Sequence, residues 1–237
     1  MYSTRLGKFI VSFPNTTEFH GLKREIFSQH IYYLDEDVET PLIIDAGAHI
    51  GLSTLYFKSM WPDARVIAIE PNPENLLYLQ KNVEENRIED VTIEPYALGI
   101  HYGQETLYVD TSEDQWNSTS SFYEKSWTNT RAGQPIPVLT KPLADYLTQP
   151  VDILKIDIEG VEEQVLLAAG DSIRQVKHLF IEFHGRPDNS LPPILKFLTD
   201  HGFSYEIWKN GRSIEPKKVV GLAIIEAHQN GKEERKA

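Results

Sequence analysis

The segment 42–53, with the sequence LIIDAGAHIGLS, constrains the fold of this chain more than any other stretch. Three apolar residues lead into Asp45, two glycines follow as Gly47 and Gly51, and an apolar periodic segment begins at Leu52. This order predicts a buried strand, a tight turn and the start of a helix. Because open α/β sheets bind ligands outside the carboxyl ends of their strands, the turn is a candidate binding site.

The glycine spacing in this turn is D-x-G-x-x-x-G rather than the G-x-G-x-x-G of dinucleotide-binding turns. In those turns the second glycine lets the backbone approach a pyrophosphate, whereas Ala48 and His49 stand there in this chain. The turn therefore favours a nucleoside ligand without phosphates. A second apolar strand, 66–69, ends at Glu70, where an acid binds the ribose hydroxyls in nucleotide-binding folds. The alternative is that Asp45 caps the next helix and Glu70 is a solvated strand end.

The two stretches DAGAHIG and IAIEPNP resemble motifs I and II of the class I S-adenosylmethionine-dependent methyltransferases. The resemblance implies that S-adenosylmethionine is the cofactor, with its methionine part on the glycine turn and its ribose on Glu70. Carried over by position, Gly47, Ala48 and Gly51 line the cofactor. The full set of predicted cofactor-binding residues is Asp45, Gly47, Ala48, His49, Gly51, Glu70, Pro71, Asn72, Ala97 and Asp157.

Length and composition narrow the class of protein further. The 237 residues suffice for one α/β domain, and the absence of cysteine excludes disulfides and thiolate zinc sites. The N-terminus has no signal-peptide pattern and no apolar run approaches about 18 residues, so we expect a cytoplasmic protein without a membrane span. The formal net charge of −12 argues against nucleic acid or an anionic membrane as the main partner.

Apolar runs alternate with amphipathic segments from residue 41 onward, which predicts right-handed βαβ units and a parallel sheet. The last two predicted strands, 203–209 and 219–226, are joined by a turn at Asn210-Gly211 without a helix, which predicts a hairpin and an antiparallel last strand. We therefore expect a Rossmann-like α/β fold with a seven-stranded, mostly parallel sheet and helices on both faces. The other predicted strands are 41–46, 65–70, 91–95, 151–157 and 177–183.

The predicted domain organisation has three parts. Residues 1–40 form an N-terminal extension that covers the cofactor or makes a dimer contact, residues 41–228 form the methyltransferase domain, and residues 229–237 form a frayed tail. Within the domain, residues 101–140 interrupt the alternation with a long polar stretch, and such loops are usually functional or disordered. Its aromatic residues favour an insertion that covers the substrate, with a surface loop anchored in the core as the alternative; they are Trp116, Phe122, Tyr123 and Trp127.

A second informative stretch, KIDIEGVE at 155–162, resembles the FkbM-type branch of these methyltransferases, as does EFH at 182–184. The resemblance covers about residues 41–208 and implies O-methyltransferase activity. The physical interpretation agrees with it, because Asp157 follows the fourth strand of the sheet and would face the same crevice as Glu70.

Four residues are predicted to carry the catalysis. A hydroxyl acceptor must lose a proton, so His184, with a pKa near neutral, is the expected base, and Asp157 is expected to orient the acceptor. Glu182 points to the same face of its strand as His184, and Lys155 is expected to pair with a carboxylate of that strand or to balance Asp157. The alternative is a structural pair of Glu182 with Lys155 and a capped His184. Asp157, Glu182 and His184 could also hold Mg²⁺, but histidine is a poor Mg²⁺ ligand, so metal dependence is not favoured.

We therefore predict a methyltransferase that uses S-adenosylmethionine to methylate a hydroxyl on a small-molecule, sugar or natural-product acceptor. N-methylation of a peptide or amide is the first alternative, and an NAD-dependent oxidoreductase is the second. A cofactor-binding subunit without catalysis is the non-enzymatic alternative. The expected partner is a small-molecule or peptide acceptor rather than nucleic acid or membrane, and a homodimer is left open.

Overall fold

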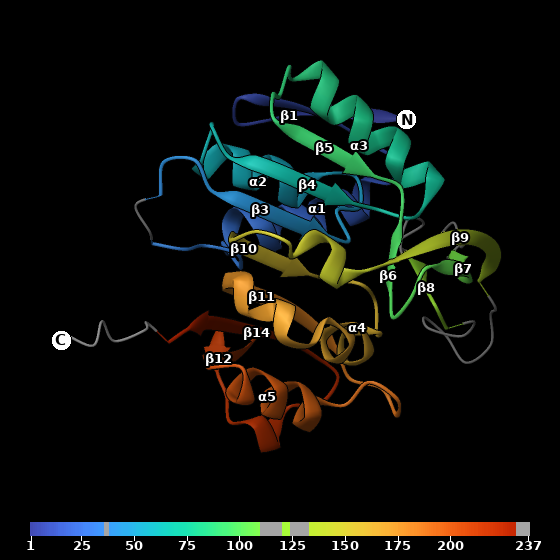
Figure 1. Ribbon diagram of the computed structural model, residues 1–237. Helices are drawn as coiled ribbons and strands as arrows, with labels where there is room; N and C mark the ends of the chain where they lie inside the picture. The colour runs from blue at the N-terminus through green and yellow to red at the C-terminus, as the bar shows by residue number, and fades with distance from the viewer. Residues whose placement is uncertain (36–37, 110–119, 124–132, 231–237) are drawn as a thin grey trace.

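The computed structural model describes residues 1–35, 38–109, 120–123 and 133–230. Its centre is an eight-stranded sheet in the order β13-β12-β14-β11-β10-β3-β4-β5 (Figure 1). The bounds of these strands are β3 Leu42–Ala46, β4 Arg65–Ile69, β5 Val91–Glu94, β10 Val151–Ile156, β11 Val176–His184, β12 Phe203–Lys209, β13 Arg212–Ser213 and β14 Leu222–Gln229.

The pairing of these strands confirms the predicted sheet. Strands β11, β10, β3, β4 and β5 run parallel to one another, whereas β14 runs antiparallel to both of its neighbours, β11 and β12. The two-residue strand β13 adds an eighth strand at the edge, so the predicted count of seven holds for the longer strands only.

Helices cover both faces of the sheet, as predicted. Neighbouring strand residues point to opposite faces, and because those of β3 are buried on both, each face needs a cover. Ile44 and Leu154 pack with Leu166 of α4 (Glu162–Ala169) and with α5 (Leu191–Asp200). Ile43 packs on the other face with Leu55 of α2 (Leu52–Met60). The third long helix on the sheet is α3 (Pro73–Glu85), which begins after its N-cap residue Asn72. None of the described helices is long and apolar enough to cross a membrane.

The N-terminal residues pack onto the sheet domain. Strands β1 (Tyr2–Leu6) and β2 (Phe9–Phe13) form an antiparallel hairpin, followed by α1 (Thr16–Lys23) and a π-helix at Arg24–Ser28. Phe19 and Tyr32 are each only 1% exposed and belong to the same apolar cluster as α2. The predicted role of residues 1–40 as a cofactor cover or dimer contact stays a prediction.

A second sheet of four strands, in the order β6-β9-β7-β8, lies beside the carboxyl end of β10 (Figure 1). Its strands are β6 (Ala97–Gly99), β7 (Gly103–Val109), β8 (Ser120–Ser121) and β9 (Gln134–Pro142). It occupies the region predicted as a substrate-covering insertion. Of the aromatic residues in that prediction, Phe122 and Tyr123 are described, whereas Trp116 and Trp127 lie outside the described residues, as does most of the predicted frayed tail.

Candidate active site

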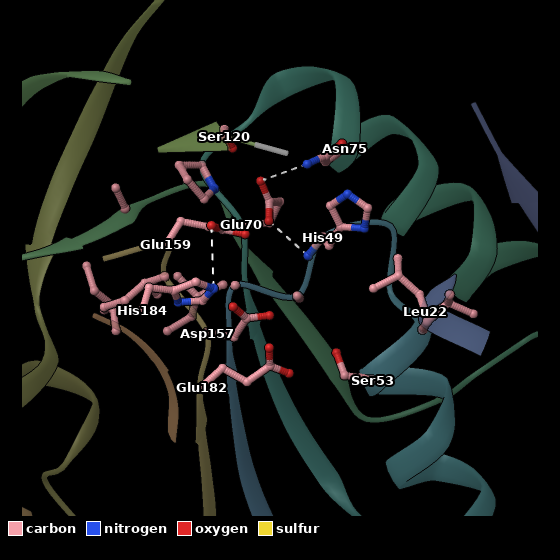
Figure 2. Close-up of a pocket in the computed structure, with 18 of the residues that line it drawn as sticks. Leu22, His49, Ser53, Glu70, Asn75, Ser120, Asp157, Glu159, Glu182 and His184 are labelled. Atoms are coloured by element: carbon pink, nitrogen blue, oxygen red, sulfur yellow. Dashed lines mark hydrogen bonds and ion pairs between the residues drawn. The ribbon is translucent and has the colours of Figure 1, made fainter. Parts of the chain in front are cut away.

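A cavity of about 390 Å³ lies at the carboxyl ends of β3, β4, β10 and β11 (Figure 2). Its volume falls in the range of about 300–1,000 Å³ that is usual for small-molecule sites. Most of the predicted site residues line it: Gly47, Ala48, His49, Glu70, Pro71, Ala97, Asp157, Glu182 and His184. Four predicted site residues do not belong to its lining, namely Asp45, Gly51, Asn72 and Lys155.

The glycine turn brings the backbone of β3 against the tip of β10. Gly47 has a φ of +76°, and a Cβ atom there would lie 1.7 Å from the backbone oxygen of Asp157. Its backbone nitrogen donates a hydrogen bond of 2.9 Å to the carbonyl of Ile69 at the end of β4. Gly51, with a φ of +91°, caps α2, and a Cβ atom there would meet the side chain of Leu79 at 2.7 Å. Gly51 therefore serves helix packing rather than direct ligand contact.

Asp45 and Lys155 hold this turn from beneath the cavity. Asp45 is fully buried and accepts hydrogen bonds of 2.7 and 2.6 Å from the hydroxyls of Ser53 and Thr54. The Lys155 ammonium lies 3.4 Å from the Asp45 carboxylate and donates a hydrogen bond of 2.6 Å to the carbonyl of Gly47. Burial lowers the pKa of Lys155, but Asp45 and Asp157 outweigh burial and raise it. The predicted cofactor contact of Asp45 and the catalytic role of Lys155 are therefore not supported, because both side chains act behind the cavity wall.

Glu70 stands at the tip of β4 and is 3% exposed. Its carboxylate accepts backbone hydrogen bonds from His49 at 2.8 Å and from Asn72 at 2.9 Å, and one from the side chain of Asn75 at 3.3 Å. Burial raises the pKa of Glu70 although these donors act against the rise. A carboxylate has about four acceptor positions, so Glu70 keeps capacity for a ligand hydroxyl. Asn72 instead caps α3 through a bond of 3.0 Å to the nitrogen of Glu74.

His49 connects the glycine turn to the N-terminal segment. Its φ is +54°, and its Nε2 lies 3.1 Å from the carboxylate of Glu18 on α1. Burial lowers the pKa of His49, but the hydrogen bond and charge of Glu18 outweigh it, so the pKa lies above its usual value. The first helix of the chain therefore contributes a wall of the cavity next to the predicted cofactor turn (Figure 2).

His184 lies at the end of β11 between two glutamates. Its Nδ1 is 3.0 Å from the fully buried carboxylate of Glu162, and its Nε2 is 3.6 Å from the carboxylate of Glu159. Burial lowers the pKa of His184, but the bond to Glu162 and the charge of Glu159 outweigh burial and raise it to about 10. A histidine that stays protonated near neutral pH cannot accept a proton from a substrate. The structure therefore argues against the predicted role of His184 as the base.

Glu182 and Asp157 also lie near the imidazole, since one ligand atom of each and one of His184 lie within 4.8 Å of one another. Glu182 accepts a hydrogen bond of 2.5 Å from the hydroxyl of Tyr32. Burial and the charge of Asp157 raise the pKa of Glu182 to about 8. Asp157 pairs with Lys155 at 3.5 Å, so the alternative pair of Lys155 with Glu182 gives way to pairs with Asp157 and Asp45.

Several functional candidates were missed in the sequence analysis. Glu159 lines the cavity with a φ of +60°, which is strained for a residue with a side chain, and burial raises its pKa to about 7. It stands within the KIDIEGVE stretch, as does Glu162, so the motif itself held the signal. Tyr32 and Glu25 line the cavity from the N-terminal segment, and no spacing in the sequence relates them to the strand tips.

The charge of the lining is one-sided. Six carboxylates line the cavity, whereas its described lining contains no lysine or arginine and only the imidazoles of His49 and His184 as basic groups. The six are Glu18, Glu25, Glu70, Asp157, Glu159 and Glu182. Such a site suits neutral or cationic ligands and disfavours anionic ones.

The order of the sheet and its antiparallel last strand define a Rossmann-like α/β fold, which solved methyltransferases share. The structure of a methyltransferase FkbM from Methylobacillus flagellatus KT aligns with 84% of this chain at a TM-score of 0.57 and 18% identity; the chain spans 47% of that structure. The magnesium protoporphyrin IX methyltransferase of Synechocystis PCC 6803, solved with bound S-adenosylmethionine, aligns with 92% of the chain and 87% of its own at a TM-score of 0.53 and 13% identity.

The family model "Methyltransferase FkbM domain" matches residues 45–205, and the chain belongs to this family of methyltransferases. Methyltransferase sdnD of Sordaria araneosa is 27% identical over 84% of this chain and 86% of its own. Methyltransferase 1 of Beauveria bassiana is 28% identical over 65% and 68%, and the 2-O-methyltransferase NoeI of Sinorhizobium fredii is 22% identical over 60% and 63%. Membership of the family removes the oxidoreductase alternative.

Proposed function

We propose that this protein transfers a methyl group from S-adenosylmethionine to a hydroxyl oxygen of a small molecule, a sugar or another natural product. One observation carries the proposal. The glycine turn and Glu70, which are suited to the cofactor, and Asp157 and Glu159, which are suited to the acceptor, line one and the same cavity. A cofactor and an acceptor bound there would lie next to each other in the same cavity.

The residues of the turn fit S-adenosylmethionine. The backbone of Asp157 leaves no room for a side chain at Gly47, so a ligand in the cavity could contact the backbone of the turn directly. Glu70 keeps acceptor capacity for a ribose hydroxyl beside its three protein donors, and Pro71 and Ala97 provide apolar wall. A bound cofactor would supply a methyl group on a sulfonium. The methyl group would pass in line to the attacking oxygen, and the neutral thioether would leave.

The chain's own contribution is to position the acceptor and to accept its proton. Holding two reactants in line supplies a large part of the catalysis of such a reaction. Glu159 is the best-placed base, because its carboxylate lines the cavity and its contact with His184 is a loose 3.6 Å. Glu182 is less free, since it already accepts the Tyr32 hydroxyl. His184, whose Nε2 lies 3.6 Å from the Glu159 carboxylate, would help to orient Glu159.

Two observations bear on the acceptor. The relative NoeI is named as a 2-O-methyltransferase, which supports oxygen as the methylated atom. The acidic lining favours an acceptor that is neutral or carries a positive charge. N-methylation of a peptide or amide stays the alternative, because a carboxylate base also serves a nitrogen nucleophile.

The experiment is a methyl-transfer assay with pooled acceptors, read by the mass gain of one methyl group. Matched pools contain neutral glycosides, amino sugars, uronic acids and short peptides. We expect transfer to neutral or amine-bearing alcohols, a loss of about 10²–10⁴-fold in kcat for Glu159→Gln, and unchanged rates for Glu105→Gln on exposed β7. Transfer only to nitrogen of peptides would replace O-methylation by the alternative, and full activity of Glu159→Gln would remove Glu159 as the base.

A further inference from the structure

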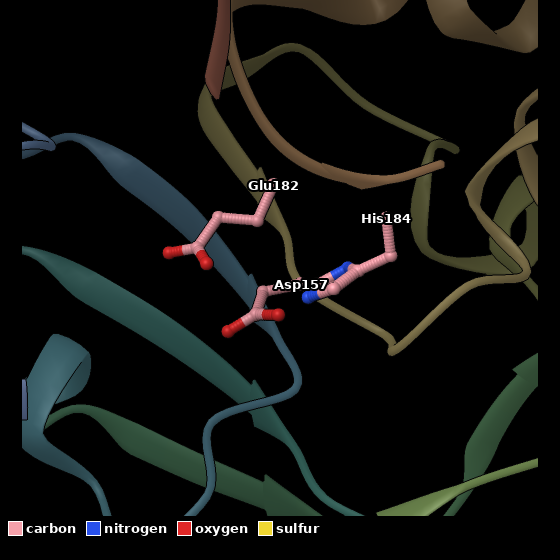
Figure 3. Close-up of side chains that lie close together, drawn as sticks. All are labelled: Asp157, Glu182 and His184. Atoms are coloured by element: carbon pink, nitrogen blue, oxygen red, sulfur yellow. The ribbon is translucent and has the colours of Figure 1, made fainter. Parts of the chain in front are cut away.

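Three side chains at the strand tips have the composition of a metal site. Asp157, Glu182 and His184 each offer one ligand atom, and these atoms lie within 4.8 Å of one another. Figure 3 shows both carboxylates and the imidazole converging from the ends of β10 and β11. Two oxygens and one nitrogen on rigid strand ends leave the remaining coordination positions open to the cavity.

The surroundings of His184 resemble those of a metal-binding histidine. The carboxylate of Glu162 lies 3.0 Å from Nδ1 of His184. The same carboxylate accepts a hydrogen bond of 2.9 Å from the backbone nitrogen of Gly160 and one from the side chain of Asn189. A carboxylate behind Nδ1 fixes the imidazole so that Nε2 is the atom presented to a metal. Asn189 also donates a hydrogen bond of 2.7 Å to the carbonyl of His184, which fixes the backbone at the same point.

One carboxylate oxygen at this point has no hydrogen-bond partner among the described residues. The Oδ1 atom of Asp157 is buried and has no hydrogen-bond partner among the described residues, while Oδ2 faces Lys155 at 3.5 Å. Glu182 and Glu159 add two further carboxylates to the same wall of the cavity. A buried carboxylate oxygen without a partner is costly, and a bound cation removes this cost.

We propose that Asp157, Glu182 and His184 bind one divalent transition-metal cation, such as Mn²⁺ or Zn²⁺, with Glu162 as the carboxylate that orients the imidazole. Mg²⁺ fits this set poorly, because it prefers six oxygen ligands in octahedral geometry. Binding displaces the proton of the imidazolium, which leaves to solvent, and Nδ1–H then donates to Glu162. The role of the ion rests on the proposed function: it would hold the acceptor oxygen and favour its loss of a proton to Glu159.

The test is a Mn²⁺ titration of the full chain without cofactor, read by the loss of the electron paramagnetic resonance signal of free Mn²⁺. We expect one ion per chain, and affinity at least about tenfold lower in His184→Gln and in Asp157→Asn. The more conservative Glu162→Gln is expected to weaken binding by about 10–100-fold without removing a ligand. Glu89→Gln, which removes an exposed acid far from the cavity, serves as the control for binding to surface charge.

Each outcome decides the proposal. Binding that falls in the three site variants and persists in Glu89→Gln supports it. Absence of Mn²⁺ and Zn²⁺ binding to the wild type overturns it, as does binding that is unchanged in His184→Gln. Each sample is also melted with and without S-adenosylhomocysteine, which reports folding of the variants. A Tm increase with S-adenosylhomocysteine but no metal binding would overturn the ion site alone. Metal binding without this Tm increase would overturn the proposed cofactor alone.

Discussion

Gly47 is the residue whose replacement tests the turn most sharply. An alanine there combines a positive φ with a Cβ that would lie 1.7 Å from the backbone of Asp157, so the turn or β10 must move. Backbone strain alone costs about 1–3 kcal/mol. We expect Gly47→Ala to lower the free energy of unfolding by more than this, because the collision adds to the strain. Chemical denaturation measures this loss, and cofactor affinity should fall with it.

Gly211 provides the matched control for this substitution. It has a similar φ of +70°, but a Cβ there would meet nothing within 4 Å. Gly211→Ala should therefore show the strain without the collision. Equal losses of stability in the two variants would mean that the close approach of the turn to β10 is not what requires Gly47.

His49 gives the stability of the protein a pH dependence with a defined sign. Its pKa is raised in the folded protein, because the hydrogen bond and charge of Glu18 outweigh the lowering by burial. The stabilisation by the charged pair is therefore fully present below the unfolded pKa of about 6.5 and is lost as pH rises through the folded value. Wild-type protein should lose stability relative to His49→Gln over this window, measured by urea unfolding at a series of pH values. A difference that stays constant with pH would contradict the pair, and Glu18→Gln should remove the slope as well.

At the scale of elements, α3 fastens the N-terminal hairpin to the sheet domain through two asparagine side chains. Asn82 accepts a hydrogen bond from the backbone nitrogen of Ser12 at 2.7 Å and donates to the carbonyls of Ser12 at 3.0 Å and Ile50 at 2.8 Å. One turn later, Asn86 pairs in the same way with the backbone of Ile10, at 2.7 Å in both bonds. The first pair is buried, whereas the second is exposed to water.

This difference in burial predicts different costs for the same substitution. Asn82→Ala leaves three buried backbone groups without a partner, each costing about 1–3 kcal/mol, so we expect a loss of more than about 3 kcal/mol. Asn86→Ala exposes its partners to water and should cost about 0.5–1.5 kcal/mol. Thermal or urea unfolding of both variants measures the two costs. Similar costs would show that the burial of the backbone partners does not set the cost.

At the scale of the whole molecule, the parts predicted from the sequence are those that repeat a local pattern. The parallel strands, the glycine turn and the antiparallel last strand follow from apolar runs, glycine spacing and the lack of an amphipathic segment between the last two long strands. The Asn210-Gly211 turn was placed wrongly, because it leads from β12 into the two-residue strand β13 and not directly into β14. The second sheet was not predicted, because the paired residues of β7 and β9 are 25 to 37 positions apart in the sequence and the stretch between these strands has no periodicity.

The candidate site was predicted in outline but not in its electrostatics. The strand-tip residues Asp157, Glu182 and His184 do come together, since parallel strands end at one edge. The protonation of His184 depends on Glu162, which stands 22 residues earlier in the sequence and meets it only in the folded protein. The hydrogen bond from Tyr32 to Glu182 joins residues 150 positions apart, which no local pattern reveals.

The most direct test of the central claim is thermal unfolding with and without S-adenosylhomocysteine, with NAD as the control ligand. At about a hundred times its Kd, a ligand stabilises the folded state by about 2.7 kcal/mol, which for a domain of this size raises Tm by about 5–10 °C. The account predicts this shift with S-adenosylhomocysteine, none with NAD, and its loss in Glu70→Ala. A shift with NAD alone, or no shift with S-adenosylhomocysteine, would contradict the assignment of the cavity as a cofactor site of this methyltransferase.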